Sequence, residues 1–150
     1  MFTMDAVLHE AQEQAPTLQA GGPESRLLME LGVDVFVNIR HYVEIGGRTG
    51  PLHDHSWRIE VVCQALRGDL HEDVLVEFAV VRERVQAIAR AWDGQVLNDL
   101  PAFRGVQPTV ENAALRLHRA VRQALAGLPV RLASVTIWEN PTHFVRLSEC

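Results

Sequence analysis

The sequence predicts an α+β domain whose elements follow the order β-β-α-α-β-β. Three observations predict this class. Two early runs alternate apolar and polar residues on either side of a loop rich in glycine and proline, which is typical of a hairpin. Two later stretches repeat apolar residues at the spacing of one helical face, and two short β-rich runs follow them. We expect strands at 33–41 and 52–63, helical stripes at 81–92 and 110–124, and strands at 130–139 and 143–147.

The composition is that of a soluble globular protein. The chain has 150 residues, of which 47% are hydrophobic and 22% charged, so it is long enough to bury a core. The formal net charge of -5 and the lack of a basic stripe argue against nucleic acid as a partner. No apolar run approaches the roughly 18 residues that span a bilayer, so we expect no membrane partner. Cys63 and Cys150 are too few for a disulfide framework, and a cytoplasmic location fits best.

The first residues differ in character from the rest. We expect residues 1–25 to form an N-terminal extension that is partly flexible, and residues 26–150 to form the single domain. Pro16 and the run Gly21-Gly22-Pro23 interrupt any helix that begins in the extension. The extension starts with acids and has no long apolar core, which is unlike a secretory signal.

The second expected strand begins with two histidines on one face. Side chains alternate along a strand, so His53, His55 and Trp57 share a face and Asp54 points to the other. Two residues of strand separate the imidazoles by about 7 Å, near enough for both to bind one ion. Zn²⁺ is the metal that such imidazoles usually bind. The alternative is that both histidines simply face water at the end of a strand.

The first expected strand ends in a third histidine. Its apolar face runs from Val33 through alternate residues to His41. The loop at 46–51 turns the chain, and the resulting hairpin would bring His41 beside His53 and His55. Three neutral imidazoles would leave Zn²⁺ its full charge and a free fourth position, the arrangement of a catalytic site. The alternative is that His41 only ends its strand.

Two helical stripes follow the hairpin. The first has apolar residues at i, i+4, i+7 and i+11, namely Val81, Val85, Ile88 and Trp92. Thr109 is a good N-cap for the second helix, and Gly127 and Pro129 end it. The second stripe comprises Val110, Ala113, Ala114, Leu117, Val121 and Ala124.

The histidine pattern resembles that of a known enzyme family. His41-x11-His53-Asp54-His55-Ser56-Trp57 is similar to the first histidine and the His-Gly-His-Asn-Tyr element of the 6-pyruvoyl and 6-carboxytetrahydropterin synthases. Later motifs resemble the family's in the same order: Val76-Glu77-Phe78 (Met-Asp-Phe), Trp92 to Asn98 (Leu-Asp-His-x-x-Leu-Asn), Pro108 to Ala114 (Pro-Thr-x-Glu-Asn-x-Ala) and Val135 to Glu139 (Val-x-Val-x-Glu-Thr). Each motif alone is modest, but the ordered set is specific and covers residues 33–147.

The resemblance implies the T-fold, in which a four-stranded antiparallel sheet carries two helices on one face. Members of the family join their sheets into rings, usually trimers that stack into hexamers, so the resemblance implies a homo-oligomer, either trimer or hexamer. It also implies sites between subunits in which three histidines hold zinc.

The resemblance also assigns a role to Glu139. This residue shares a strand face with Val135 and Ile137. By position it is the family's glutamate that anchors the amino-pyrimidine edge of the pterin. A carboxylate that faces two N–H donors in one plane is a physically sound anchor. The alternative for Glu139 is a strand-end residue in water.

The chain departs from the family at the groups that transfer protons. The family's cysteine stands four residues before the first histidine of the His-x-His pair, where this chain has Thr49. The family's Asp-His pair is Asp93 followed by Gly94 here. A threonine hydroxyl is too weak an acid to replace a thiolate. Cys63 lies ten residues, roughly 30 Å, along the strand from His53. The metal site and the anchor therefore remain, while the base and its relay are missing.

The candidate site residues fall into three groups. The expected metal ligands are His41, His53 and His55, and the catalytic candidates are Glu139, Asp93 and Thr49. The expected substrate contacts are Glu139, Thr109 and Tyr42, and Tyr42 and His143 are further acid or base candidates.

Three functions remain open. The favoured one is a zinc-dependent enzyme on the family's scaffold with altered chemistry, a small-molecule cyclase or condensing enzyme. It would close an amine on a carbonyl in a Pictet–Spengler-like step, on a substrate with an amine or amino-heterocycle edge. An alternative is a 6-carboxytetrahydropterin synthase-type lyase acting on dihydroneopterin triphosphate, with Arg40, Arg48 and Arg104 as cationic partners for the triphosphate. A third is a non-catalytic zinc-binding or pterin-binding module.

Overall fold

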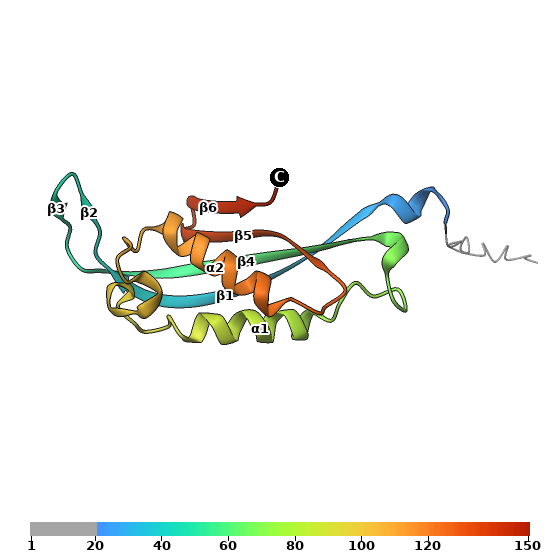
Figure 1. Ribbon diagram of the computed structural model, residues 1–150, viewed down its shortest axis with the longest axis horizontal. Coiled ribbons are helices and arrows are strands. Elements are labelled where there is room, and N and C mark those ends of the chain that lie inside the picture. The colour runs from blue at the N-terminus through green and yellow to red at the C-terminus, as the bar shows by residue number, and fades with distance from the viewer. Residues whose placement is uncertain (1–20) are drawn as a thin grey trace, which may run out of the picture.

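The computed structural model describes residues 21–150 and contains the predicted α+β architecture (Figure 1). A four-stranded antiparallel sheet has the strand order β1-β4-β5-β6, and helices α1 and α2 lie together against one face of it. The elements are β1 (Leu28–His41), β2 (Glu44–Ile45), β3 (Arg48–Thr49), β4 (His53–Leu66), α1 (Phe78–Arg90), α2 (Val110–Ala124), β5 (Arg131–Asn140) and β6 (His143–Ser148). The fold class predicted from the sequence is therefore confirmed.

The hairpin of β1 and β4 is longer than the sequence predicted. Strand β1 begins at Leu28 rather than Val33, and β4 continues to Leu66 rather than ending at Cys63. The two strands pair along their whole length, from Leu28 opposite Leu66 to His41 opposite His53. Leu31 and Val33 are buried on either side of the exposed Gly32, so the apolar alternation continues through the glycine.

The loop of this hairpin forms a small hairpin of its own. Strands β2 and β3 pair through Glu44 opposite Thr49 and Ile45 opposite Arg48. Gly46 and Gly47 have φ angles of 58° and 76° at the tip. Two successive residues with positive φ are the requirement of a tight type I′ turn, which glycine meets without a steric penalty. The segment projects from the end of the sheet (Figure 1).

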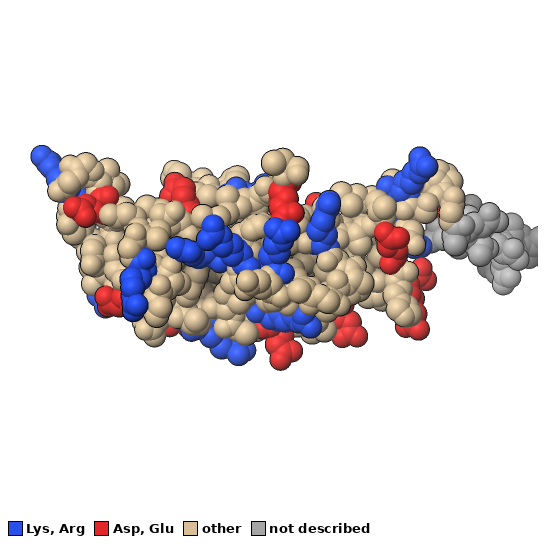
Figure 2. Space-filling model, in the orientation of Figure 1, with Lys and Arg blue, Asp and Glu red and all other residues tan. Residues whose placement is uncertain are grey.

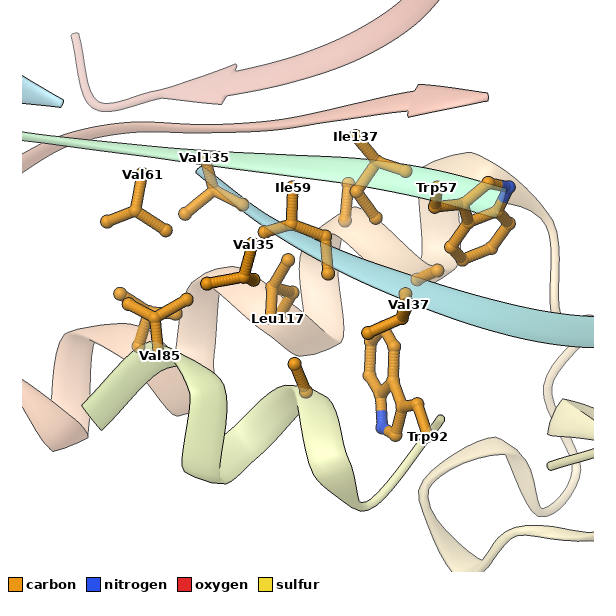
Figure 3. Packing of buried hydrophobic residues seen from close by; sticks show 14 of the residues in the cluster. Val35, Val37, Trp57, Ile59, Val61, Val85, Trp92, Leu117, Val135 and Ile137 are labelled. Atoms are coloured by element: carbon orange, nitrogen blue, oxygen red, sulfur yellow. The ribbon is translucent and has the colours of Figure 1, made fainter. Parts of the chain in front are cut away.

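The core lies between the sheet and the two helices. Figure 3 shows Val35, Ile59 and Val135 on the sheet facing Val85 of α1 and Leu117 of α2. On α1 the buried residues are Val81, Val85 and Ala89, whereas Ile88 of the predicted stripe is only partly buried. Trp92 lies beyond the end of α1, is 5% exposed and packs edge-on against Phe103 at 5.4 Å between ring centroids.

Helix α2 begins and packs as predicted. The side chain of Thr109 caps it, because Oγ1 accepts a hydrogen bond from the backbone N–H of Asn112 at 3.1 Å. The buried residues of the helix are Val110, Ala113, Ala114, Leu117 and Val121. Ala124 is only partly buried, and Leu125 fills the last core position instead.

The chain before β1 is described only in part. Pro23–Arg26 form a short 3-10 helix that leads into β1. The expected N-terminal extension falls mostly on residues 1–20, outside the described residues. None of the helices in residues 21–150 is long and apolar enough to cross a membrane.

We expect the core to tolerate truncation on α2 only where the side chain faces water. Leu117 is fully buried, so Leu117→Ala should lower the free energy of unfolding by about 2–5 kcal/mol. Leu115 on the same helix is 39% exposed, and Leu115→Ala should change it by no more than about 0.5 kcal/mol. Urea unfolding followed by circular dichroism measures both, and equal effects would contradict the packing described.

Candidate metal centre and its pocket

The register of β1 and β4 brings three histidines together. His41 lies directly opposite His53, and His55 follows two residues later on the same face. One ring nitrogen from each of the three lies within 4.8 Å of the others. The fully buried Trp57 lies behind them, with its ring centroid 5.7 Å from that of His41. The predicted convergence of His41, His53 and His55 is therefore present.

Backbone carbonyls orient two of the imidazoles. His41 Nδ1 lies 2.8 Å from the carbonyl oxygen of Pro108, and His53 Nδ1 lies 2.8 Å from that of Pro51. Since a carbonyl oxygen can only accept, each Nδ1 carries the proton and donates it. In the neutral rings each Nε2 then carries a lone pair. These two Nε2 atoms face each other at 2.9 Å, an arrangement that favours a cation between them.

The third imidazole has an unused nitrogen. His55 Nε2 is buried and has no hydrogen-bond partner among the described residues, although it lies 3.1 Å from Glu139 Oε1. Burial lowers the pKa of His55, against the opposing charge of Glu139. Burial also lowers the pKa of His41, outweighing its hydrogen bond to Pro108. Neutral rings are the form that binds metal.

These features fit Zn²⁺. Three neutral imidazoles with converging nitrogens leave one of four tetrahedral positions free, as in catalytic zinc sites. The Nδ1 hydrogen bonds of His41 and His53 to carbonyls are the outer contacts that fix ligand orientation in such sites. At a Zn–N distance of about 2.0–2.1 Å, two tetrahedral ligands stand roughly 3.3 Å apart. The separations in the cluster, 2.9 Å for His41 to His53 and up to 4.8 Å, bracket that value.

A pocket of about 340 Å³ opens beside the histidines. The lining mixes polar and apolar side chains, and the residues are His41, Val43, Ile45, His53, Thr109, Val110, Glu111, Glu139, His143, Phe144 and Val145. We call the apolar residues of this lining the apolar wall. The only formal charges among these residues are the carboxylates of Glu111 and Glu139, and no arginine lines the pocket in the described chain. The pocket is therefore suited to a neutral or cationic ligand with an apolar part.

Some of the predicted site residues meet at this pocket. Glu139 and Thr109 line it together with two of the histidines, as does the acid–base candidate His143. The Oγ1 atom of Thr109 is also the cap of α2. His143 Nδ1 lies 2.9 Å from Asn140 Oδ1, which anchors the ring at the start of β6.

Other predicted residues lie away from the pocket within this chain. Thr49 is exposed on β3, and Tyr42 is 39% exposed with its backbone held by Asn98. The carboxylate of Asp93 accepts a hydrogen bond from the backbone N–H of Asn38 at 2.8 Å. None of the three lines the pocket. Their proposed roles would require a second copy of the chain.

Asp54 does not join the histidines. Its carboxylate lies 2.9 Å from Nε of Arg40, on the sheet face opposite the helices. The strand alternation that excluded Asp54 as a ligand is consistent with this pairing. The pairing also engages Arg40, one of the three arginines considered for a triphosphate.

The sequence did not reveal the carbonyls of Pro51 and Pro108 or the apolar wall of the pocket. The alternation of Val43 and Ile45 around Glu44 was a signal for the wall, since it places both apolar side chains on one side. No local signal marks Pro108, because the distance of 67 residues between it and His41 is closed only by the fold.

The fold and the cluster define a T-fold protein with three histidines placed so that they could hold a metal ion. Residues 32–150 match the family model described as 6-pyruvoyl tetrahydropterin synthase, and the chain belongs to that family. No match is found among curated protein sequences.

Solved structures of the same fold come from distant organisms. The Caenorhabditis elegans 6-pyruvoyl tetrahydropterin synthase superposes with a TM-score of 0.72 at 15% identity, covering 84% of this chain and 99% of the other. The Plasmodium vivax 6-pyruvoyl tetrahydropterin synthase gives 0.68 at 14%, covering 82% and 98%. An uncharacterized protein from Wolinella succinogenes gives 0.66 at 18%, covering 81% and 98%. At these identities the likeness shows the fold alone.

We expect the metal to depend on the histidine cluster. Zinc-loaded wild-type protein should retain about one ion per chain after dialysis, because three imidazoles converge. His53→Ala removes a ligand and should weaken zinc affinity by at least about tenfold. His71→Ala, an exposed histidine outside the cluster, is the control and should behave as wild type. Elemental analysis and competition with a chelator measure both, and unchanged affinity in His53→Ala would rule out the assigned centre.

Proposed function

We propose that the chain is a zinc-dependent enzyme of the tetrahydropterin synthase family with altered chemistry. It would be a small-molecule cyclase or condensing enzyme that joins an amine to a carbonyl in a Pictet–Spengler-like ring closure. The observation that carries this proposal is the pocket beside the histidine cluster, which has two carboxylates, no arginine and an apolar wall. Such a lining favours an amine over an anion.

The reaction class has a simple balance. The amine nitrogen bonds to the carbonyl carbon, and the carbonyl oxygen leaves as water. A nucleophilic carbon of the substrate then attacks the same carbon to close the ring and gives up its proton. The chain must therefore orient an amine, take up protons and keep solvent from the reacting atoms.

Side chains of the pocket can meet these needs. The carboxylate of Glu139 would hold the amine or the N–H edge of a heterocycle by charge-assisted hydrogen bonds. Glu139, Glu111 and His143 line the pocket and could accept protons. Bound by His41, His53 and His55, zinc would supply a Lewis acid that polarises the carbonyl.

The apolar wall supports a substrate with an apolar body. Val43 and Ile45 approach from the small hairpin, Val110 from the start of α2, and Phe144 and Val145 from β6. Ile45 is 76% exposed and Phe144 47% exposed, so a substrate would cover surface that otherwise faces water. This contact would also exclude water from the neighbouring reactive groups.

Family membership favours a second candidate, a lyase of the 6-carboxytetrahydropterin synthase type that acts on dihydroneopterin triphosphate. It would need cations for the triphosphate and a base in place of the family's cysteine. Arg40 is paired with Asp54, and neither Arg48 nor Arg104 lines the pocket. Thr49 stands at the position of the cysteine, on β3. Within one chain, the pairing of Arg40 and the lack of an arginine in the lining of the pocket support the cyclase or condensing enzyme over the lyase.

We also propose that the chain works as a homo-oligomer, a trimer or hexamer, in the cytoplasm. Strands β1 and β6 are the edges of the sheet in residues 21–150, and β1 is 14 residues long. Long free edges invite pairing with another sheet. Such an assembly could place Asp93, Thr49 and Tyr42 beside the pocket of a second copy.

Ligand binding separates the candidates. Zinc-loaded protein should bind phenethylamine, and Glu139→Gln should weaken this binding about tenfold or more, because the amide lacks the charge that holds the ammonium. Glu83→Gln, an exposed glutamate on α1, is the matched control and should leave it unchanged. Isothermal titration calorimetry measures affinity, and elemental analysis should show the same zinc content in both variants.

Turnover gives the decisive contrast. Dopamine with phenylacetaldehyde should give a cyclised product faster with zinc-loaded protein than with His53→Ala. Release of tripolyphosphate from dihydroneopterin triphosphate by the wild type would instead establish the lyase and overturn the proposal. If the protein binds zinc but neither binds the amine nor turns over either substrate, the non-catalytic binding module is the function that remains.

A further inference from the structure

The two helices carry an unusual share of the chain's positive charge. Helices α1 and α2 hold six arginines and two glutamates, in a chain whose formal net charge is -5. The arginines are Arg82, Arg84, Arg90, Arg116, Arg119 and Arg122. Figure 2 shows basic side chains across the middle of the face that the helices cover, with acidic side chains mostly near its rim. We call this face the arginine face.

Three arginines on the opposite face of the molecule are paired with carboxylates. On the sheet surface that the helices leave free, Arg40 lies 2.9 Å from Asp54 and Arg58 lies 3.8 Å from Asp34. Arg146 on the same surface lies 3.5 Å from a carboxylate oxygen of Glu60. Arg40 and Arg58 thus have carboxylates on the neighbouring strand, and Arg146 of β6 reaches across β5 to Glu60 of β4.

The arginine face lacks this compensation. Of its six arginines, only Arg122 has a carboxylate within 4 Å in the described part of the chain, Glu149 at 3.0 Å. Arg84 is used within the fold, since its Nη1 donates to the carbonyl of Ala124 at 2.7 Å and so ties α1 to the end of α2. Arg82, Arg90 and Arg119 are exposed, with no carboxylate near them in residues 21–150.

The charged surface also offers apolar contacts. Leu115, Arg119 and Arg122 are spaced at i, i+4 and i+7, so they form one exposed stripe along α2. Leu115 is 39% exposed, and Phe78 at the start of α1 is 61% exposed. Arginine guanidinium groups beside exposed apolar side chains are typical of protein–protein interfaces.

We propose that the arginine face is a docking surface for an acidic polypeptide, a segment of a partner protein rich in Asp and Glu with apolar anchors. The planar guanidinium pairs with a carboxylate through two hydrogen bonds, which gives orientation as well as attraction. A single-stranded nucleic acid is less well matched, because such sites interleave several stacking aromatics and Phe78 is the single Phe, Trp or Tyr on the two helices. This inference does not depend on the reaction proposed above.

Fluorescein-labelled poly-L-glutamate is a direct probe. A chain of net charge -5 should repel it unless a local cationic surface binds it. Anisotropy should show saturable binding to the zinc-loaded wild-type protein at about 50 mM salt, weakened at about 200 mM. The double variant Arg116→Glu/Arg119→Glu should raise the dissociation constant about tenfold or more.

A matched control has the same change of charge elsewhere. Arg26→Glu/Arg48→Glu alters two exposed arginines away from the helices and should change the affinity less than about twofold. Circular dichroism should show that both double variants keep the wild-type fold. No binding by the wild type, an equal loss in both double variants, or tighter binding of poly(U) RNA or anionic vesicles than of polyglutamate would each overturn the proposal.

Discussion

The antiparallel register between β1 and β4 is the constraint on which the histidine cluster depends. It sets His41 opposite His53 and leaves His55 on the same face, two residues further along β4. A shift of one residue would turn one set of side chains to the other side of the sheet and separate the three rings. The same register buries Val37, Ile39 and Trp57, so the apolar core and the cluster share one cause.

Hydrophobic packing therefore offsets the repulsion between the imidazoles of the histidine cluster. Two Nε2 atoms at 2.9 Å, each with its Nδ1 bound to a carbonyl, repel each other when both rings are neutral. The pairing along 14 residues of β1 and the buried helices hold the rings in place despite this. A cation would turn the local repulsion into attraction, so binding of a metal would stabilise the fold.

Much of the architecture could be predicted because its signals are local. Strand alternation revealed the shared face of His53, His55 and Trp57, and side-chain chemistry revealed the Thr109 cap. The strand ends were less accurate, since Leu28 joins β1 through its partner Leu66 and not through a pattern of its own. Ile88 was assigned to the core because a spacing of seven residues is close to two helical turns, but Ala89 is the residue that faces the sheet.

The site was harder to predict, because its walls come from distant segments. Pro108 reaches His41 across 67 residues, and the apolar wall joins the small hairpin to β6. Motif order located Glu139 near the histidines, whereas spacing alone could not show that its carboxylate lies 3.1 Å from His55. Only packing also reveals that Asp93 points to the backbone of Asn38.

The departures from the family pattern fall outside the buried core. Thr49 and Gly94 lie on exposed segments, although the φ of 71° at Gly94 is one that favours glycine. His41 and His53, in contrast, are bound into the hairpin and to two carbonyls. Substitution at the proton-transfer positions therefore leaves the core intact, while loss of the ligands would disturb the hairpin end. A scaffold built in this way can keep its three histidines and Glu139 in place while other residues around the pocket change.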